Sequence, residues 1–204
     1  MTQTEIFAVL SAMADRMEEE KEFLTDLDNA IADGDHGINM ARGFRAAADK
    51  LPDLQDKDLG TVFRTFGMTL VSTVGGSAGP LYGTAFLRAG AAAAGKRELD
   101  ADGFTECLKA AIDGVMARGK AVKGEKTMLD AMIPAYEAMS DAKKSAKERF
   151  LCGVKAAEAG VEYTKTIAAT KGRASYIGER SIGHQDPGAT SFTYLLQTVE
   201  KAVK

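Results

Sequence analysis

The feature that most constrains the fold of this chain is the spacing of its apolar residues. They recur three and four positions apart along most of the 204 residues, for example at Ile6, Leu10, Met13 and Met17. This spacing puts apolar side chains on one face of an α-helix. The same pattern recurs over residues 59–70, 104–115 and 150–161, whereas the alternating β-branched runs typical of strands are nearly absent. The sequence therefore predicts an all-α fold.

The pattern also predicts where the helices lie. We expect helices over residues 3–20, 22–31, 38–50, 58–73, 80–95, 102–118, 127–140 and 143–165, and a last one over 188–202. No Pro/Gly/Ser-rich linker and no internal repeat divides the chain. We therefore expect residues 1–204 to form one all-α domain, arranged as a bundle or a closed ring of helices.

Composition excludes several classes of protein. A hydrophobic fraction of 45%, a charged fraction of 27% and a net charge of −3 give no basic surface for nucleic acid or for an anionic membrane. Residues 1–10 do not resemble a signal peptide, and no apolar stretch is long enough to span a bilayer. Cys107 and Cys152 read as small core residues in a reducing compartment. We expect a cytoplasmic protein with no nucleic-acid or membrane partner.

Three carboxylates lie within eight residues, at Asp28, Asp33 and Asp35. The first ends a predicted helix and the other two flank Gly34 on the turn that follows, so all three can point at one place. Such close negative charges repel unless a cation lies between them, and hard oxygen ligands suit Mg²⁺ together with phosphate. An ordinary Asp-Gly turn is the alternative. A calcium EF-hand loop is excluded because no Glu stands at its twelfth position.

Two further segments are suited to anions. Residues 75–80 read Gly-Gly-Ser-Ala-Gly-Pro and lead into a predicted helix, with Pro80 at its first position. A glycine-rich turn before a helix N-terminus can bind phosphate, although a plain helix connection would look the same. The long connection over residues 166–187 carries Arg173, Arg180 and His184, which argues for contact with an anion.

Other motifs have adequate structural explanations. Thr127 and Asp130 resemble a capping box at a helix start, and Met128 is typical of a core residue that could also pack on a base. Asp186 and Pro187 are typical of the N-cap and first residue of the last helix.

His36 stands beside the carboxylates and could bond a phosphate oxygen or an aspartate. No Walker A or dinucleotide-binding fingerprint is present.

Taken together, a carboxylate cluster, a glycine-rich helix start and an arginine-bearing loop are the parts of a phosphoryl-transfer site. Such chemistry needs metal, positioning and positive charge more than a covalent group.

Four segments in this order also resemble a known family. Residues 31–40, 75–83, 124–130 and 172–189 are similar to the nucleotide-binding L subunit, or domain, of dihydroxyacetone kinases, and the resemblance covers nearly the whole chain. It implies an antiparallel eight-helix barrel with ADP or ATP at one end. It also implies two Mg²⁺ ions that are held by three aspartates and bridge the phosphates.

The resemblance assigns roles residue by residue. The metal ligands are Asp28, Asp33 and Asp35, and Arg173 approaches the phosphates from the long loop as the catalytic arginine. The nucleotide-binding residues that it implies are His36, Gly37, Ile38, Asn39, Gly76, Ser77, Ala78, Gly119, Thr127, Met128, Arg173, Asp186, Pro187 and Gly188. Ile38 departs from the small polar residue, such as Thr, that is expected at its position.

The family also implies partners. A separate K subunit holds the ketose on a histidine, so we expect this chain to be a subunit rather than a complete kinase. Some members exchange ATP freely, and others keep ADP bound and are rephosphorylated by a phosphohistidine M subunit of the sugar phosphotransferase system. The substrate is dihydroxyacetone or a related ketose such as a tetrulose. The alternatives are the related domain of fatty acid kinase and a nucleotide-dependent coregulator of a transcription factor.

Overall fold

The computed structural model describes residues 1–203, and its regular secondary structure is helical. Its α-helices are α1 (Gln3–Glu19), α2 (Lys21–Ile31), α3 (His36–Ala48), α4 (Leu59–Thr73), α5 (Ala78–Ala92), α6 (Ala101–Gly119), α7 (Leu129–Met139), α8 (Ala146–Thr164) and α9 (Pro187–Ala202). Two 3₁₀ helices, η1 (Leu51–Leu54) and η2 (Arg173–Ser181), complete them. Within residues 1–203 the only β-type pairing is an isolated bridge between Thr2 and Glu98. The prediction of an all-α fold is confirmed.

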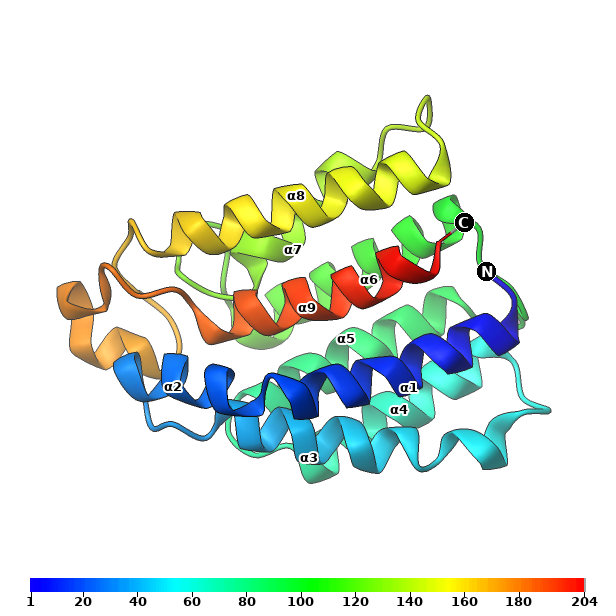
Figure 1. Ribbon diagram of the computed structural model, residues 1–204, viewed down its shortest axis with the longest axis horizontal. Helices are drawn as coiled ribbons and strands as arrows, with labels where there is room; N and C mark the ends of the chain where they lie inside the picture. The colour runs from blue at the N-terminus through cyan, green and yellow to red at the C-terminus, as the bar shows by residue number, and fades with distance from the viewer. Residues whose placement is uncertain (204) are drawn as a thin grey trace.

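The helices form a closed ring. Helix α1 contacts α3, each later helix contacts the next along the chain, and α9 returns to contact α1. Neighbouring helices run in opposite directions, and the two chain ends lie together at one end of the ring (Figure 1). Helix α2 and η2 lie at the opposite end (Figure 1). The antiparallel eight-helix barrel implied by the family resemblance is therefore present, with α2 as an extension of α1.

Most predicted helix limits agree with the structure to within a few residues, and three details were wrong. Helix α5 starts at Ala78, which makes Pro80 its third residue and not its first. Proline is tolerated there because N–H groups in the first turn of a helix have no partner within the helix, so the missing N–H costs no hydrogen bond. Helix α7 starts after Met128 rather than at Thr127. The segment 166–187 is not wholly irregular, because it contains η2.

The α4–α5 pair is packed unusually closely. A Cβ added at Gly67 would lie 2.8 Å from the carbonyl oxygen of Gly83, and a Cβ added at Gly83 would lie 2.8 Å from that of Gly67. Gly60 and Gly90 stand in the same reciprocal relation, also at 2.8 Å. Only glycine allows the two backbones to come this close. The short connection between these helices, residues 74–77, is therefore held between two tightly packed helices.

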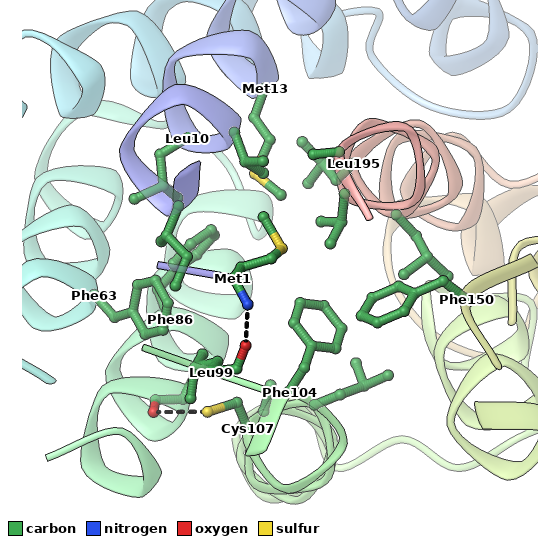
Figure 2. A pocket seen from close by; sticks show the side chains of 18 of the residues that line it. Met1, Leu10, Met13, Phe63, Phe86, Leu99, Phe104, Cys107, Phe150 and Leu195 are labelled. Atoms are coloured by element: carbon green, nitrogen blue, oxygen red, sulfur yellow. Dashed lines mark hydrogen bonds between the residues drawn. The ribbon is translucent and has the colours of Figure 1, made fainter. Parts of the chain in front are cut away.

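The barrel interior is apolar and incompletely filled. A cavity of about 430 Å³ lies near the chain ends and is lined by side chains that include Met1, Phe63, Phe104 and Phe150 (Figure 2). The amino group of Met1 donates to the carbonyl oxygen of Leu99 at 2.6 Å. Most of the lining residues are apolar, and Glu5 and Asp100 are the acidic residues among them. Among residues 1–203, no helix combines the length and apolarity needed to cross a bilayer.

Candidate phosphoryl-transfer site

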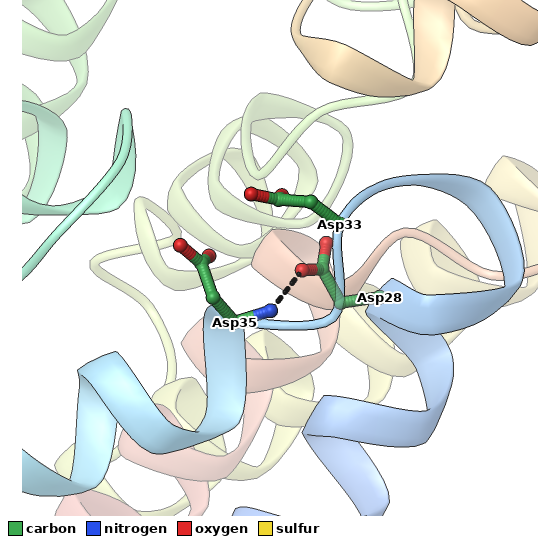
Figure 3. A group of neighbouring side chains, drawn as sticks. All are labelled: Asp28, Asp33 and Asp35. Carbon is green, nitrogen blue, oxygen red and sulfur yellow. Dashed lines mark hydrogen bonds between the residues drawn. The ribbon is translucent and has the colours of Figure 1, made fainter.

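The three predicted carboxylates meet at the end of the barrel opposite the chain ends. Asp28 lies in the last turn of α2, and Asp33 and Asp35 lie on the turn that leads to α3. Their side chains approach one another (Figure 3), with one oxygen from each within 4.8 Å of the others. A carboxylate oxygen of Asp28 accepts hydrogen bonds from the backbone N–H of Asp35 at 2.9 Å and of His36 at 3.2 Å. The buried Asp28 thus fixes the turn that presents the other two.

Gly34 makes this turn possible. Its φ of +71° lies in the left-handed region, and a Cβ there would overlap the side chain of Asn29. The resulting donor set is three carboxylates and no nitrogen or sulfur ligand. Such a set fits a hard divalent cation such as Mg²⁺, which accepts carboxylate oxygens and takes further oxygens from water and phosphate.

A cavity of about 350 Å³ opens beside the carboxylates. Fourteen of the predicted site residues line it, from elements far apart in the sequence: Asp28, Asp33, Asp35, His36, Gly76, Ser77, Ala78, Gly119, Thr127, Met128, Arg173, Asp186, Pro187 and Gly188. The sequence motifs are thus brought to one place. The roles assigned to these residues stay predictions, because the geometry shows only their proximity.

Three predicted nucleotide-binding residues do not line this cavity. Gly37 instead allows α2 and α3 to approach, because a Cβ there would lie 2.0 Å from the carbonyl oxygen of Lys21. The side chain of Ile38 is 51% exposed, and the Oδ1 atom of Asn39 accepts a hydrogen bond from Arg42 at 2.6 Å. Arg180 and His184 also lie outside the cavity, so Arg173 is the one member of the predicted anion-binding trio that reaches it.

His36 is used internally. Its Nε2 atom lies 2.9 Å from the Ser191 hydroxyl, which in turn lies 2.7 Å from the Tyr82 hydroxyl. Burial lowers the pKa of His36 to about 4, although a hydrogen bond with the backbone of Pro187 acts in the opposite direction. The imidazole is therefore neutral near pH 7 and joins α3 to α9. The ring forms no hydrogen bond to an aspartate within residues 1–203, and its predicted bond to a phosphate oxygen stays a prediction.

The glycine-rich turn faces the carboxylates. Gly76 has a φ of +63°, and the atoms nearest to a Cβ built there are the carboxylate oxygens of Asp35, at 3.7 and 3.9 Å. The turn leads into α5, whose N-cap residue Ser77 makes no side-chain capping bond. The first backbone N–H groups of α5 are therefore available to an anion placed next to Asp35.

Four basic side chains line the cavity. Arg173 forms an ion pair with Asp33, and Arg118, Lys126 and Lys171 are the other three. None of these last three residues was predicted from the sequence to lie at the site. Lys126 could have been predicted from its position directly before Thr127. Lys171 could have been predicted from its position two residues before Arg173 in the long loop.

Asp186 starts α9 as predicted. Its carboxylate accepts the backbone N–H of Ala189 at 2.6 Å, and Pro187 is the first helical residue. Burial raises the pKa of Asp186 to about 7, and the nearby Asp130 and Asp28 carboxylates raise it further, whereas Ala189 and Lys126 lower it. This side of the cavity therefore holds a carboxyl group that titrates near neutral pH.

Comparison with known proteins shows which family this chain resembles. The chain matches the DAK2 domain over residues 30–201. It is 43% identical over 207 residues to the ADP-binding subunit DhaL of the PEP-dependent dihydroxyacetone kinase of Escherichia coli K12, a match that covers 100% of this chain and 99% of that one. It is 47% identical over 193 residues to the corresponding subunit of kinase 1 of Listeria innocua, with 93% of each chain covered.

More distant matches are longer proteins. The L-erythrulose 1-kinase of Mycolicibacterium smegmatis is 32% identical over 197 residues, covering 95% of this chain and 34% of that one. Among solved structures, the dihydroxyacetone kinase of C. freundii has the same fold, with a TM-score of 0.73 and 24% identity over 97% of this chain and 34% of that one. That kinase has also been solved with AMP-PNP and Mg²⁺. The chain belongs to the DAK2 domain family, among the DhaL-type subunits of dihydroxyacetone kinases.

Proposed function

We propose that this chain is the nucleotide-binding subunit of a dihydroxyacetone kinase. One observation supports this above the others: the three carboxylates, the glycine-rich start of α5 and Arg173 surround a single cavity of about 350 Å³. In this proposal, residues 1–204 act as one nucleotide-binding domain. The ketose is supplied by a separate K subunit, as the family membership and the full-length match to ADP-binding subunits suggest.

Each group has a role in phosphoryl transfer. Asp28, Asp33 and Asp35 hold two Mg²⁺ ions, which neutralise phosphate charge when bound. The backbone N–H groups at the start of α5 bind phosphate oxygens, and Thr127, Met128 and Gly119 lie on the side of the adenine. Arg173 adds positive charge at the transferred phosphoryl group. The bond from the γ-phosphorus of ATP to the β–γ bridging oxygen breaks while a bond to the ketose hydroxyl oxygen forms. ADP is the leaving group, and the hydroxyl proton is released to solvent.

The phosphoryl donor in the proposal is the sugar phosphotransferase system. The similar subunits of E. coli and L. innocua are named as parts of PEP-dependent kinases and as ADP-binding. By analogy, ADP stays bound here as a coenzyme and is rephosphorylated in place by a phosphohistidine M subunit. Free exchange with ATP is the alternative. The proposed location is the cytoplasm, where these partners would be found.

A second ketose remains a candidate substrate. Erythrulose kinases are among the relatives, at 30–32% identity, and the identities to dihydroxyacetone kinase subunits are higher, at 40–47%. Because the K subunit binds the ketose, the choice between a triose and a tetrulose is made outside this chain. Assay of both sugars with the partner subunit would separate the two.

The nucleotide content and exchange rate of the purified chain test the proposal. Bound nucleotide is released with acid and identified, and native protein is then incubated with labelled ATP and Mg²⁺. Retained ADP that does not exchange supports a coenzyme role, and rapid exchange supports an ATP-consuming subunit. If the protein carries no nucleotide and binds none in the presence of Mg²⁺, the proposed function is wrong.

A further inference from the structure

Lys126 is buried, at 1% exposed, and forms no direct ion pair within residues 1–203. Burial lowers the pKa of its ammonium group, although the nearby Asp186 and Asp130 carboxylates favour the charged form. The Nζ atom instead donates to backbone carbonyl oxygens of Thr164 at 2.6 Å, Ser181 at 2.7 Å and His184, with Ile167 more distant at 3.3 Å. An ammonium group is costly to bury, so its retention here calls for an explanation.

The four acceptors lie where the segment 165–186 begins and where it ends. Thr164 is the last residue of α8, and the other three lie near the two ends of the segment 165–186, which carries Arg173. Carbonyls at a helix C-terminus are partly negative and lack partners within the helix, which suits a cation. A single ammonium group therefore joins the end of α8 to both ends of the segment that bears Arg173.

The backbone of Lys126 gives a second, independent observation. Its φ is +59°, in the left-handed region that disfavours side chains and favours glycine. The neighbouring Gly124 has a φ of +94° and meets the same demand without strain. If only the path of the backbone mattered, glycine would suit position 126 better. A lysine in this conformation indicates that the hydrogen bonds of its ammonium group are needed at this position.

Lys126 also connects this segment to another part of the cavity wall. It directly precedes Thr127 and Met128, which line the cavity. Its neighbour Glu125 accepts a backbone hydrogen bond from Thr170 at 3.3 Å. Bonds within the segment, from Gly183 to Lys165 at 2.8 Å and from Ala169 to the Ser181 hydroxyl at 2.8 Å, close its base directly around the ammonium group.

We propose that Lys126 is a positioning residue that clamps the segment 165–186 and so holds Arg173 beside the three aspartates. The clamp itself rests on the contacts above, and its effect on phosphoryl transfer rests on the proposed function.

Two variants remove the ammonium group in different ways. Lys126→Met keeps the length of the side chain without its donors, and Lys126→Gly also relieves the left-handed backbone. Lys123→Met is the control, because Lys123 is exposed on the same turn.

Hydrogen–deuterium exchange of the full chain tests the clamp without any assay of function. In both Lys126 variants we expect exchange in residues 165–186 to rise about tenfold or more while α4 and α5 stay at the wild-type rate. Lys123→Met should match the wild type throughout. Wild-type exchange in residues 165–186 of Lys126→Met and Lys126→Gly would overturn the proposal, and so would a uniform rise over all helices.

The kinetic test uses the complete kinase with its K and donor subunits. Misplacing Arg173 should lower kcat about 10- to 100-fold with a smaller change in the KM for the ketose, because the ketose is bound by the other subunit. Addition of n-butylammonium to Lys126→Gly should restore part of kcat, and tetramethylammonium, which has no N–H donor, should not. Equal effects of both cations, or no loss of kcat in either variant, would contradict the proposal. If the wild-type protein binds no nucleotide, the proposed function is wrong. The hydrogen–deuterium exchange experiment would then still test whether Lys126 clamps the segment 165–186.

Discussion

Arg173 forms an ion pair with Asp33, one of the three clustered carboxylates. Both side chains are partly exposed, at 48% and 38%, and ion pairs in such surroundings contribute little to stability. The guanidinium group can therefore leave the carboxylate at small cost once a cation takes that place. In the proposed function, the partner that then attracts Arg173 is the phosphoryl group next to the metal.

Replacing Arg173 should impair catalysis and leave the fold intact. We expect Arg173→Met to lower kcat about 100-fold or more, the usual effect of removing one group that stabilises transition-state charge. Its melting temperature should change little, because the ion pair is exposed. Steady-state kinetics of the complete kinase would measure this, with Arg180→Met as the control, since Arg180 lies on the same segment outside the cavity. Equal losses in both variants would contradict a specific role for Arg173.

Removing one carboxylate should abolish metal-dependent binding. In Asp33→Asn we expect ADP affinity to lose its dependence on Mg²⁺ and phosphoryl transfer to fall below detection, because the cluster loses a charged oxygen ligand. Isothermal titration with ADP, with and without EDTA, would measure the change. Asp26→Asn is the matched control, since Asp26 is exposed on α2 away from the cluster. Wild-type Mg²⁺ dependence in Asp33→Asn would show that the cluster is only a turn.

Asp186 should make stability depend on pH. Its pKa is about 7 in the folded protein and about 3.8 in ordinary surroundings, so between these values the folded state keeps a proton that the unfolded state has lost. Its contribution to the free energy of unfolding therefore falls as the pH rises from about 4 to 7. Asn keeps a cap acceptor without the charge. Relative to the wild type, Asp186→Asn should be more stable at pH 8 than at pH 5 by roughly 2–4 kcal/mol.

Urea denaturation of nucleotide-free and metal-free protein at the two pH values would measure this difference. Asp100→Asn is the control, because Asp100 is an exposed N-cap residue that accepts the backbone N–H of Gly103 at 2.8 Å. If the stability of Asp186→Asn relative to the wild type is the same at pH 5 and pH 8, the carboxyl group does not titrate in this range.

The α4–α5 contact should not tolerate a methyl group. In Gly67→Ala the new Cβ would lie 2.8 Å from the Gly83 carbonyl oxygen, so the two backbones must separate. We expect a loss of roughly 1–3 kcal/mol in the free energy of unfolding, the usual cost of overpacking. Gly103→Ala in α6 is the comparison, because the atoms nearest to its Cβ are side-chain atoms at 3.1 Å and beyond. Thermal denaturation should rank Gly67→Ala well below Gly103→Ala, and the reverse order would contradict the interpretation.

Much of the fold was predictable because each helix carries its own apolar face. The limits of α2 and α9 followed from local signals, such as the cap formed by Asp186 and Pro187. The closure of the ring was not visible in any one segment, since it depends on contacts between α1 and α9. The periodicity alone left a bundle and a closed ring both open, and only the resemblance to a family favoured the ring.

The site was predictable where a motif carries its own chemistry, as the three aspartates do. It was not predictable where a side chain acts over a long distance in the sequence. His36 bonds Ser191, which is 155 residues away, and Lys126 bonds carbonyl oxygens up to 58 residues away. Backbone carbonyls have no sequence signature, so the environment of Lys126 could be recognised only in three dimensions.

The reciprocal glycine contacts between α4 and α5 have a consequence for how a ligand leaves. They fix residues 74–77, so the wall that would face the phosphates keeps its shape whether the cavity is filled or empty. We expect opening on the other side, where residues 165–186 are held by hydrogen bonds to carbonyl oxygens and by a small apolar contact of Ala169 and Ala174 with Ile31. We therefore expect the residence time of a bound nucleotide to depend on that segment, so that changes there could convert a retained coenzyme into a rapidly exchanging substrate without altering α4 or α5.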